Sequence, residues 1–231
     1  MLTLYYARPS AYARPVWLAL LEKQVPFQLV AVDLSGEQFQ PPFRAVNPFS
    51  HVPVLVDGSV RVIESLAILD YLEARYPTPS FLPQGAEALA TVRMVQLLTF
   101  NELLPGIISL LMHDEERTAP DLDWHYAQNR IQTTLAYWEP MLAGSLYFAG
   151  DQLTLAEIVA GTLVHRLPDV GIPLTDFPHL AAWSDRLLTR PTWQQIALSP
   201  EEWHQFKRRM KVMPKVWARR RRSVLRVAVP S

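Results

Sequence analysis

The sequence predicts an α/β domain followed by an all-helical domain. Three observations support this prediction: strand patterns occur only before residue 64, helical patterns continue beyond residue 86, and a stretch rich in proline lies between them. A chain of 231 residues is long enough for two small domains, since domains commonly hold about 100–150 residues. We expect the first domain, a linker, the helical domain and a basic tail at residues 1–77, 78–86, 87–206 and 207–231.

The elements of the first domain are expected in the order βαβαββα. Their ranges are residues 2–6 for a strand that ends before Arg8-Pro9-Ser10, 12–23 for a helix with Pro15 near its start, 27–32 for a strand, 37–45 for a weak helix or loop, 52–56 and 59–63 for strands around Asp57-Gly58, and 64–76 for an amphipathic helix stopped by Pro77. Two strands joined by a helix run parallel, whereas the last two form a hairpin. We therefore expect a mixed four-stranded sheet of the thioredoxin-like type.

The second domain carries helical patterns only. The expected helices cover residues 87–113, 122–143, 154–167, 178–189 and 191–209. Thr154 precedes Glu157 by three positions, which predicts a capping box at the start of the third helix. No charged residue falls between Glu157 and His165, so we expect this helix to be central and buried. Pro105-Gly106 is expected either to kink the first helix or to end it.

Composition excludes several classes of function. Hydrophobic residues make up 49% and charged residues 19% of the chain, as is typical of globular proteins. No window approaches the roughly eighteen or more apolar residues that a bilayer-spanning helix needs, and the start lacks the pattern of a signal peptide, so we expect a cytoplasmic protein without a transmembrane segment. The chain has no cysteine, which excludes disulfides and a cysteine nucleophile. Its six histidines show no paired spacing, so we expect no metal site.

The formal net charge of zero hides an asymmetry between the body and the end of the chain. Residues 207–231 hold ten basic and no acidic residues, which leaves 12 basic against 22 acidic in residues 1–206. The run Arg219-Arg220-Arg221-Arg222 lies close to Trp217. Three interpretations stay open: docking on the acidic body, a disordered solubilising extension, or contact with an anionic partner such as nucleic acid or a membrane surface.

Several motifs occur in a fixed order along the chain. They are Ser10 four residues before Arg14-Pro15, Asn47-Pro48 leading to His51-Val52-Pro53-Val54-Leu55, Glu64-Ser65 at the start of a helix, and Gly150-Asp151 before Thr154 and Glu157. With the order of the elements, these motifs resemble the cytosolic glutathione transferase family in its serine type, theta-like, delta-like or bacterial. The resemblance covers nearly the whole chain, to about residue 206.

The resemblance implies that Ser10 is the catalytic residue. The family's chemistry needs a thiolate, and a free thiol with a pKa of about 8.5 is only a few per cent ionised near neutral pH. A serine hydroxyl that donates a hydrogen bond to the sulfur favours the charged form. Without the resemblance, a turn serine bonded to local backbone would be the better interpretation. Tyr5 and Tyr6 compete with Ser10 for the catalytic role, but their place inside a strand favours a packing role. Arg14 either supplies a positive field or is a solvated helix residue.

The resemblance also implies a set of glutathione-binding residues. Val52-Pro53 matches the family's cis proline, which would let the Val52 backbone pair with glutathione; the alternative is an edge-strand proline. Glu64 and Ser65 open a helix, where Ser65 and the free amides would bind the γ-glutamyl carboxylate and Glu64 the amino group; an ordinary helix cap is compatible with this role. Gln38 and His51 match contacts to the glycyl end. His51 replaces a lysine common in the motif and is equally well explained as an exposed loop histidine.

The resemblance implies an enzyme, a glutathione transferase, that activates glutathione as co-substrate for attack on a small electrophilic or hydrophobic molecule. The acceptor pocket is expected between Ser10 and the second domain, lined by Tyr12, Phe100, Leu103, Leu104, Ile107 and Ile108, although core packing explains most of these equally well. A homodimer is expected, as in the family. The alternative is a non-enzymatic binding or regulatory protein. Thiol-disulfide exchange is excluded by the absence of cysteine, whereas isomerase and dehalogenase chemistry stay open.

Overall fold

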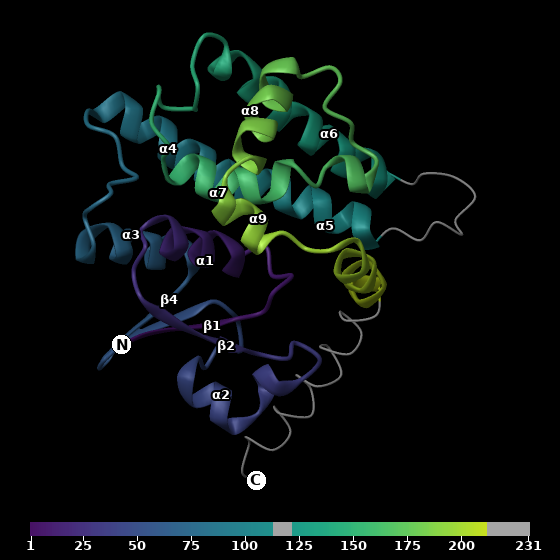
Figure 1. Cartoon of the computed structure of the whole chain (residues 1–231). Coiled ribbons are helices and arrows are strands. Elements are labelled where there is room, and N and C mark those ends of the chain that lie inside the picture. Colours follow the sequence, from purple (N-terminus) through teal and green to yellow (C-terminus); the bar gives the residue numbers. More distant parts are fainter. Residues whose placement is uncertain (113–121, 212–231) are drawn as a thin grey trace.

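The computed structural model describes residues 1–112 and 122–211, which form two parts (Figure 1). The first part has the predicted order βαβαββα: β1 (Leu2–Tyr6), α1 (Ala13–Glu22), β2 (Phe27–Ala31), the short turn η1 (Glu37–Phe39), α2 (Pro41–Val46), β3 (Val54–Asp57), β4 (Val60–Ile63) and α3 (Ser65–Arg75). The second part is helical: α4 (Ala86–Leu98), η2 (Thr99–Leu103), α5 (Leu104–Met112), α6 (Leu122–Trp138), η3 (Glu139–Leu142), α7 (Leu155–Val164), η4 (Pro168–Val170), α8 (Pro178–Leu188) and α9 (Pro191–Ile196). The predicted fold class is confirmed.

The four strands form one mixed sheet in the order β2-β1-β3-β4. β1 runs parallel to β2, with Leu4 opposite Leu29, and antiparallel to β3, with Leu4 opposite Leu55. β3 and β4 form the predicted hairpin. Gly58 at its turn has a φ of 59°, a left-handed conformation that glycine adopts without steric cost.

Helix α1 lies between the sheet and the helical domain, with α2 on the other side of the sheet (Figure 1). Residues 13–20 of α1 are buried, and the helix packs against α3, α7 and α9. One apolar cluster therefore extends from the sheet through α1 into the helical domain, with Leu4, Leu18 and Ile196 among its buried members. This shared core fixes the start of α1, and the turn before it, against both domains.

Residues 86–112 form one continuous helix, in which the widened π-helical turn η2 precedes Pro105. Proline has no amide hydrogen, and its ring clashes with the carbonyl four residues earlier. The wider turn accommodates this, and the Asn101 carbonyl accepts a hydrogen bond from Arg130 instead. Gly106 allows a close approach of α6, because a Cβ there would lie 2.8 Å from Ile131 Cγ1. Pro105-Gly106 therefore does not end the helix.

The same helix, Ala86–Met112, is long and apolar enough by length and composition to cross a membrane, with a hydropathy of 1.5. The expectation that no stretch would pass such a test is wrong. The helix packs against α6 and α7, and Val92, Val95 and Leu103 belong to the main core. Its packing is that of a core helix in the helical domain.

The helix predicted over residues 191–209 is two helices. α9 ends at Ile196, and a second helix covers residues 200–211. Pro200 restricts the residue before it to an extended backbone, which interrupts the helix. Ser199 Oγ accepts the Glu202 amide at 3.1 Å, and Glu202 Oε2 accepts the Ser199 amide at 2.8 Å. This reciprocal pair is a capping box that restarts the helix.

The capping box predicted at Thr154 is confirmed. Thr154 Oγ1 accepts the Ala156 amide at 3.2 Å, and Glu157 Oε2 accepts the Thr154 amide at 2.9 Å. Every residue of α7 is buried, and this burial raises the pKa of Glu157. α7 is the central helix that the uncharged stretch predicted.

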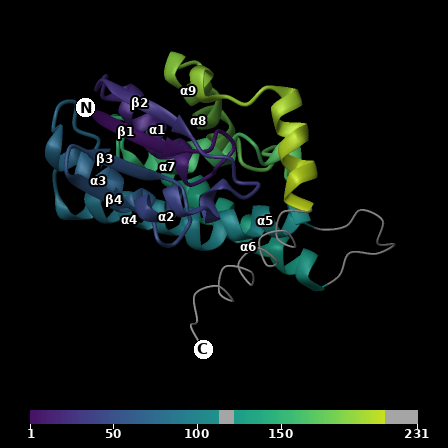
Figure 2. The ribbon, with the colours of Figure 1, turned by 90° about the horizontal axis from the view of Figure 1, so that it is seen from below.

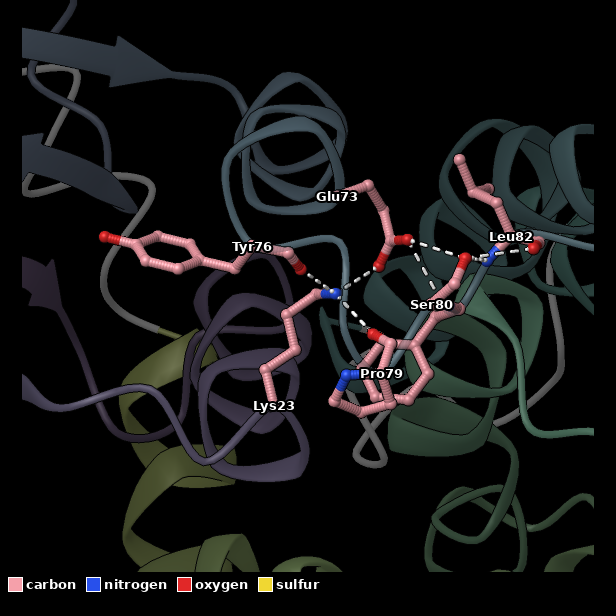
Figure 3. Close-up of polar contacts among 7 residues, drawn as sticks. Lys23, Glu73, Tyr76, Pro79, Ser80 and Leu82 are labelled. Carbon is pink, nitrogen blue, oxygen red and sulfur yellow. Dashed lines mark hydrogen bonds and ion pairs between the residues drawn. The ribbon is translucent and has the colours of Figure 1, made fainter.

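A buried ion pair holds the linker to the first domain (Figure 3). Lys23, directly after α1, places Nζ 2.8 Å from Glu73 Oε1 on α3. The same ammonium group donates to the carbonyls of Tyr76, at 2.8 Å, and Pro79, at 2.7 Å. Ser80 Oγ donates to Glu73 Oε2 at 3.3 Å. One lysine therefore joins the end of α1, the end of α3 and the linker, a contact that no sequence motif indicated.

Candidate active site

A cleft of about 440 Å³ opens in the first domain. This volume lies within the range of about 300–1,000 Å³ that is common for small-molecule sites. The residues that line it are Ser10, Tyr12, Leu34, Gln38, Phe39, Asn47, Ser50, His51, Val52, Pro53, Glu64 and Ser65. The cleft therefore brings together the expected catalytic serine and all six residues of the expected binding set.

Ser10 lies in the turn between β1 and α1. Its Oγ accepts a hydrogen bond from the Ala13 amide at 3.2 Å, and its carbonyl accepts one from the Arg14 amide at 3.1 Å. Within residues 1–112 and 122–211, its own hydroxyl hydrogen has no acceptor. Ser10 is thus both a turn serine that caps backbone and a cleft residue with a free donor. The oxygen already accepts a hydrogen bond, which polarises the O–H group as a donor.

The N-terminal end of α1 adds positive potential next to Ser10. Its first turn holds no acidic residue. Arg14 is 4% exposed and donates to the Thr162 carbonyl at 3.4 Å, while its Nε has no partner in the described part of the chain. Burial, followed by the charges of Arg166 and Arg8, lowers the pKa of Arg14 to about 10, so that it stays charged at neutral pH. Arg14 does not line the cleft; it is a buried cation between the domains, and the interpretation as a solvated residue is wrong.

Glu64 and Ser65 form the start of α3 at the cleft. Glu64 has a φ of 69°, a conformation that costs a residue with a side chain about 1–3 kcal/mol and is concentrated at functional sites. No side chain caps α3, so its first amides can receive an anion. Ser65 Oγ donates to the Tyr12 carbonyl at 2.8 Å, which links α3 to the segment of Ser10. Burial, and then the Glu64 carboxylate, raises the pKa of Tyr12, so its hydroxyl stays protonated at neutral pH.

The loop before β3 forms a further part of the cleft. The Val52-Pro53 bond is cis, as the resemblance implied, and Thr78-Pro79 in the linker is cis as well. Asn47 is buried and donates from Nδ2 to the His51 carbonyl at 2.7 Å, which fixes the loop. Asn47 and Ser50 line the cleft but were missing from the expected set. The Asn47-Pro48 motif was a signal for the first, whereas nothing in the sequence marks Ser50.

Gln38 brings a buried acceptor to the cleft. Its side chain is 2% exposed, and Nε2 donates to the Leu34 carbonyl at 2.9 Å. Its Oε1 has no partner among the described residues. A buried oxygen without a donor costs free energy, so this atom is suited to accept an N–H group from a ligand. His51 is exposed at the cleft.

The residues expected around an acceptor pocket divide into two groups. Tyr12 and Phe100 lie in contact, with ring centroids 5.0 Å apart, and Tyr12 lines the cleft. The others lie in the core and are absent from the lining of this cleft: Leu103, Leu104, Ile107 and, partly buried, Ile108. The competing tyrosines also pack away from the cleft, Tyr5 against Phe43 and Tyr6 against Trp17.

In residues 1–112 and 122–211, no group of three or more histidine or carboxylate side chains is arranged to hold a metal ion. The expectation of a reaction without a metal stays a prediction.

Comparison with known proteins gives matches over most of the chain. The family model "Glutathione S-transferase, N-terminal domain" matches residues 4–80, and "Glutathione S-transferase, C-terminal domain" matches residues 102–191. Glutathione S-transferase 1 of Dianthus caryophyllus is 32% identical over 190 residues, covering 80% of this chain and 86% of the relative. Maleylacetoacetate isomerase of Rattus norvegicus is 29% identical over 196 residues, covering 82% and 88%. A delta-class glutathione transferase of Nilaparvata lugens superposes with a TM-score of 0.77 at 26% identity, covering 92% of this chain and all of that one.

Proposed function

The chain belongs to the glutathione S-transferase family, and we propose that its cleft binds glutathione with the sulfur beside the Ser10 hydroxyl. The protein is an enzyme of the glutathione transferase type. The observation that carries the site proposal is the hydrogen bonding of Ser10, whose Oγ accepts the Ala13 amide at 3.2 Å and keeps its hydrogen free to donate. A serine in this state does not serve as a base, but it stabilises an anion.

Three features favour the thiolate of bound glutathione over the thiol: the Ser10 hydroxyl, the positive end of α1 and the buried charge of Arg14. A hydrogen bond to a charged group contributes about 1.5–3 kcal/mol, which corresponds to about one to two units of pKa. Such a shift brings the pKa of the thiol close to neutral pH. The thiolate then attacks an electrophilic carbon and forms a carbon–sulfur bond. The displaced electron pair leaves with a leaving group or, in an addition, is taken up by a proton.

The rest of the tripeptide is proposed to lie along the other cleft residues. The γ-glutamyl carboxylate fits the free amides at the start of α3, and the Glu64 carboxylate fits its amino group. Ser65 Oγ now donates to the Tyr12 carbonyl, so it must turn from this acceptor to donate to the ligand. The Val52 backbone ahead of Pro53 is proposed to pair with the cysteinyl segment. Gln38 Oε1, which is buried without a donor, is proposed to accept a hydrogen bond from a peptide N–H of glutathione. His51 is proposed to lie at the glycyl end.

The acceptor is proposed to be a small electrophilic or hydrophobic molecule next to Tyr12 and Phe100, at the boundary of the two domains. We further propose a homodimer in the cytoplasm. Exposed apolar side chains along α4, among them Met94 and Leu97, support a protein interface on that helix.

The test is an ultraviolet titration of glutathione with the protein from pH 5 to 9, which records thiolate absorbance. We expect bound glutathione to ionise about one to two pH units below free glutathione, and Ser10→Ala to remove most of this shift. Ser80→Ala is the matched control, since Ser80 Oγ also accepts a backbone amide at 3.2 Å, from Leu82, but lies outside the cleft. A panel of electrophiles then separates conjugation, peroxide reduction, isomerisation and dehalogenation.

If glutathione binds to the wild-type protein without a shift in the pKa of its thiol, the catalytic role proposed for Ser10 is wrong. Absence of any binding would favour the alternative of a non-enzymatic protein on the same fold. If Ser10→Ala and Ser80→Ala reduce the pKa shift of bound glutathione equally, the effect is a general one on stability and not specific to Ser10.

A further inference from the structure

Ser10 is the last residue of a β-turn that links β1 to α1. The Ala7 carbonyl accepts the Ser10 amide at 2.9 Å, which makes Arg8 and Pro9 the two central residues of this turn. Proline in the third position is disfavoured in the commonest type of turn, because it restricts the backbone of the residue before it. The local sequence therefore favours this turn only weakly, and the contacts of the Arg8 side chain gain importance.

Arg8 ties the turn to the segment that follows α9. Its Nε lies 2.6 Å from Glu202 Oε1, and its Nη2 donates to the Ala197 carbonyl at 2.9 Å. Its guanidinium also lies over the Trp17 ring on α1, 5.5 Å from the centroid. A planar guanidinium that is held at two of its nitrogens and on one face has little freedom left. We call residues 197–203, which supply two of these contacts, the C-terminal strap.

The C-terminal strap is itself fixed to the helical domain. It leads from α9 into the helix over residues 200–211, which stands at the edge of the molecule (Figures 1 and 2). Arg166, which follows α7, donates from Nη2 to the Leu198 carbonyl at 2.8 Å, and its guanidinium lies 5.2 Å from the centroid of the Trp203 ring. Trp203 packs against the main core. The strap is thus supported by the helical domain and holds the turn of the first domain.

We propose that Arg8 is a positioning residue for Ser10: through Arg8, the C-terminal strap holds the Ser10 hydroxyl at the sulfur of bound glutathione. A hydrogen bond weakens steeply as its geometry departs from the ideal, so a turn with more freedom would stabilise the thiolate less. The inference rests on the proposed role of Ser10 and adds a residue that does not line the cleft. The helical domain then contributes to the chemistry of a cleft that the first domain lines.

The alternative is a direct effect of the Arg8 charge on the thiolate, and Glu202 distinguishes the two. Glu202→Met removes the acceptor of the Arg8 Nε hydrogen bond together with a negative charge beside the turn. If charge alone acted, the pKa of the bound thiol would fall, because Arg8 would lose its counter-ion. Loss of positioning would raise this pKa instead. The two explanations therefore predict opposite signs.

The test is the ultraviolet titration of glutathione with each variant from pH 5 to 9. Glu202 stays ionised over this range, because the hydrogen bond from the Ser199 amide lowers its pKa. We expect Arg8→Gln and Glu202→Met each to raise the pKa of the bound thiol by about 0.5–1 unit, part of the shift that Ser10→Ala removes. In the Ser10→Ala background, Arg8→Gln should raise it no further, because Arg8 acts through Ser10. The Arg8 and Glu202 side chains are 37% and 38% exposed, so these variants should fold.

Arg190→Gln is the matched control. Arg190 also joins the two domains through a carboxylate, 2.6 Å from Glu22 Oε2, and also lies over a tryptophan, 5.8 Å from the centroid of Trp193. Glu22 is the last residue of α1, at the opposite end of this helix from Ser10. Loss of this pair should therefore leave the pKa of the bound thiol unchanged.

Ser199→Ala controls for the capping box, because it removes the acceptor of the Glu202 amide and leaves Arg8 its partner. Three results would overturn the inference: a lower thiol pKa in Glu202→Met, an effect of Arg8→Gln no larger than that of Arg190→Gln, or equal effects of Ser199→Ala and Glu202→Met. Each of these, with the Ser10→Ala effect intact, overturns the inference alone. If Ser10→Ala keeps the full shift, the proposed function is wrong and the inference falls with it.

Discussion

Lys23→Met should be among the most destabilising single substitutions in the first domain. The Lys23 side chain is fully buried, and its ammonium group contacts Glu73 at 2.8 Å and the carbonyls of Tyr76 and Pro79. Methionine keeps most of the volume but removes the charge, so the Glu73 carboxylate, only 6% exposed, would stay in the interior without its counter-ion. Removing one partner of a buried ion pair costs about 3–5 kcal/mol. We expect the free energy of unfolding to fall by about this amount.

Urea unfolding followed by tryptophan fluorescence measures this loss. Arg93→Met is the matched control, because Arg93 on α4 pairs at 2.7 Å with Asp70, which lies on α3 as Glu73 does, but these two side chains are 35% and 51% exposed. Exposed pairs contribute about 0–1 kcal/mol. The double variant Lys23→Met/Glu73→Leu removes both charges and should recover most of the loss. Our reasoning is refuted if Lys23→Met costs no more than Arg93→Met, or if the double variant is no more stable than the single one.

Three other predictions concern the cleft, acid stability and helix packing. Ser65→Ala should raise the Kd for glutathione about tenfold or more, because a hydrogen bond to a charged group contributes about 1.5–3 kcal/mol; calorimetric titration with unchanged affinity would exclude this contact. Burial, and then the charge of Arg14, lowers the pKa of His165 from 6.5 to about 4, so the folded state resists a proton that the unfolded state accepts. Stability should therefore fall as the pH drops from 6.5 to about 4, by at most about 3 kcal/mol, and His165→Gln should lose this part of the pH dependence in urea unfolding; an identical profile would contradict the assignment. Gly106→Ala should lower the free energy of unfolding by about 1–3 kcal/mol, because the new Cβ meets Ile131 Cγ1 at 2.8 Å. An unchanged unfolding midpoint would contradict this and would mean that α6 shifts to make room for the methyl group.

Local chemistry predicted most of the fold. Alternating apolar residues, the Asp57-Gly58 turn and the Thr154 capping box are short-range signals, and the structure contains each of them. One helix was predicted over residues 191–209 because the apolar periodicity continues across Pro200. Pro200 and the capping residue Ser199 were the local signals of the break that the structure contains. Pro105, in contrast, does not interrupt its helix, because the preceding turn is widened and accommodates the proline.

The site was predictable where it rests on consecutive residues, as at Val52-Pro53 and Glu64-Ser65. Burial of Arg14 was not, because it depends on α7 packing against α1 from a distant part of the chain. The Lys23–Glu73 ion pair was not predictable for the same reason, because its partners are 50 residues apart and no sequence pattern connects them. Long-range packing, which a linear pattern does not contain, decides these features.

The lining of the cleft comes from residues 10–65 alone, and the helical domain approaches it through Phe100 against Tyr12. The lining of the cleft and the helical domain that approaches it therefore belong to two separate blocks of the sequence. Substitutions in the helical block can change what approaches the cleft while the residues that line it stay constant. A duplicated gene could in this way diversify its reaction partners without having to rebuild a binding site from the beginning.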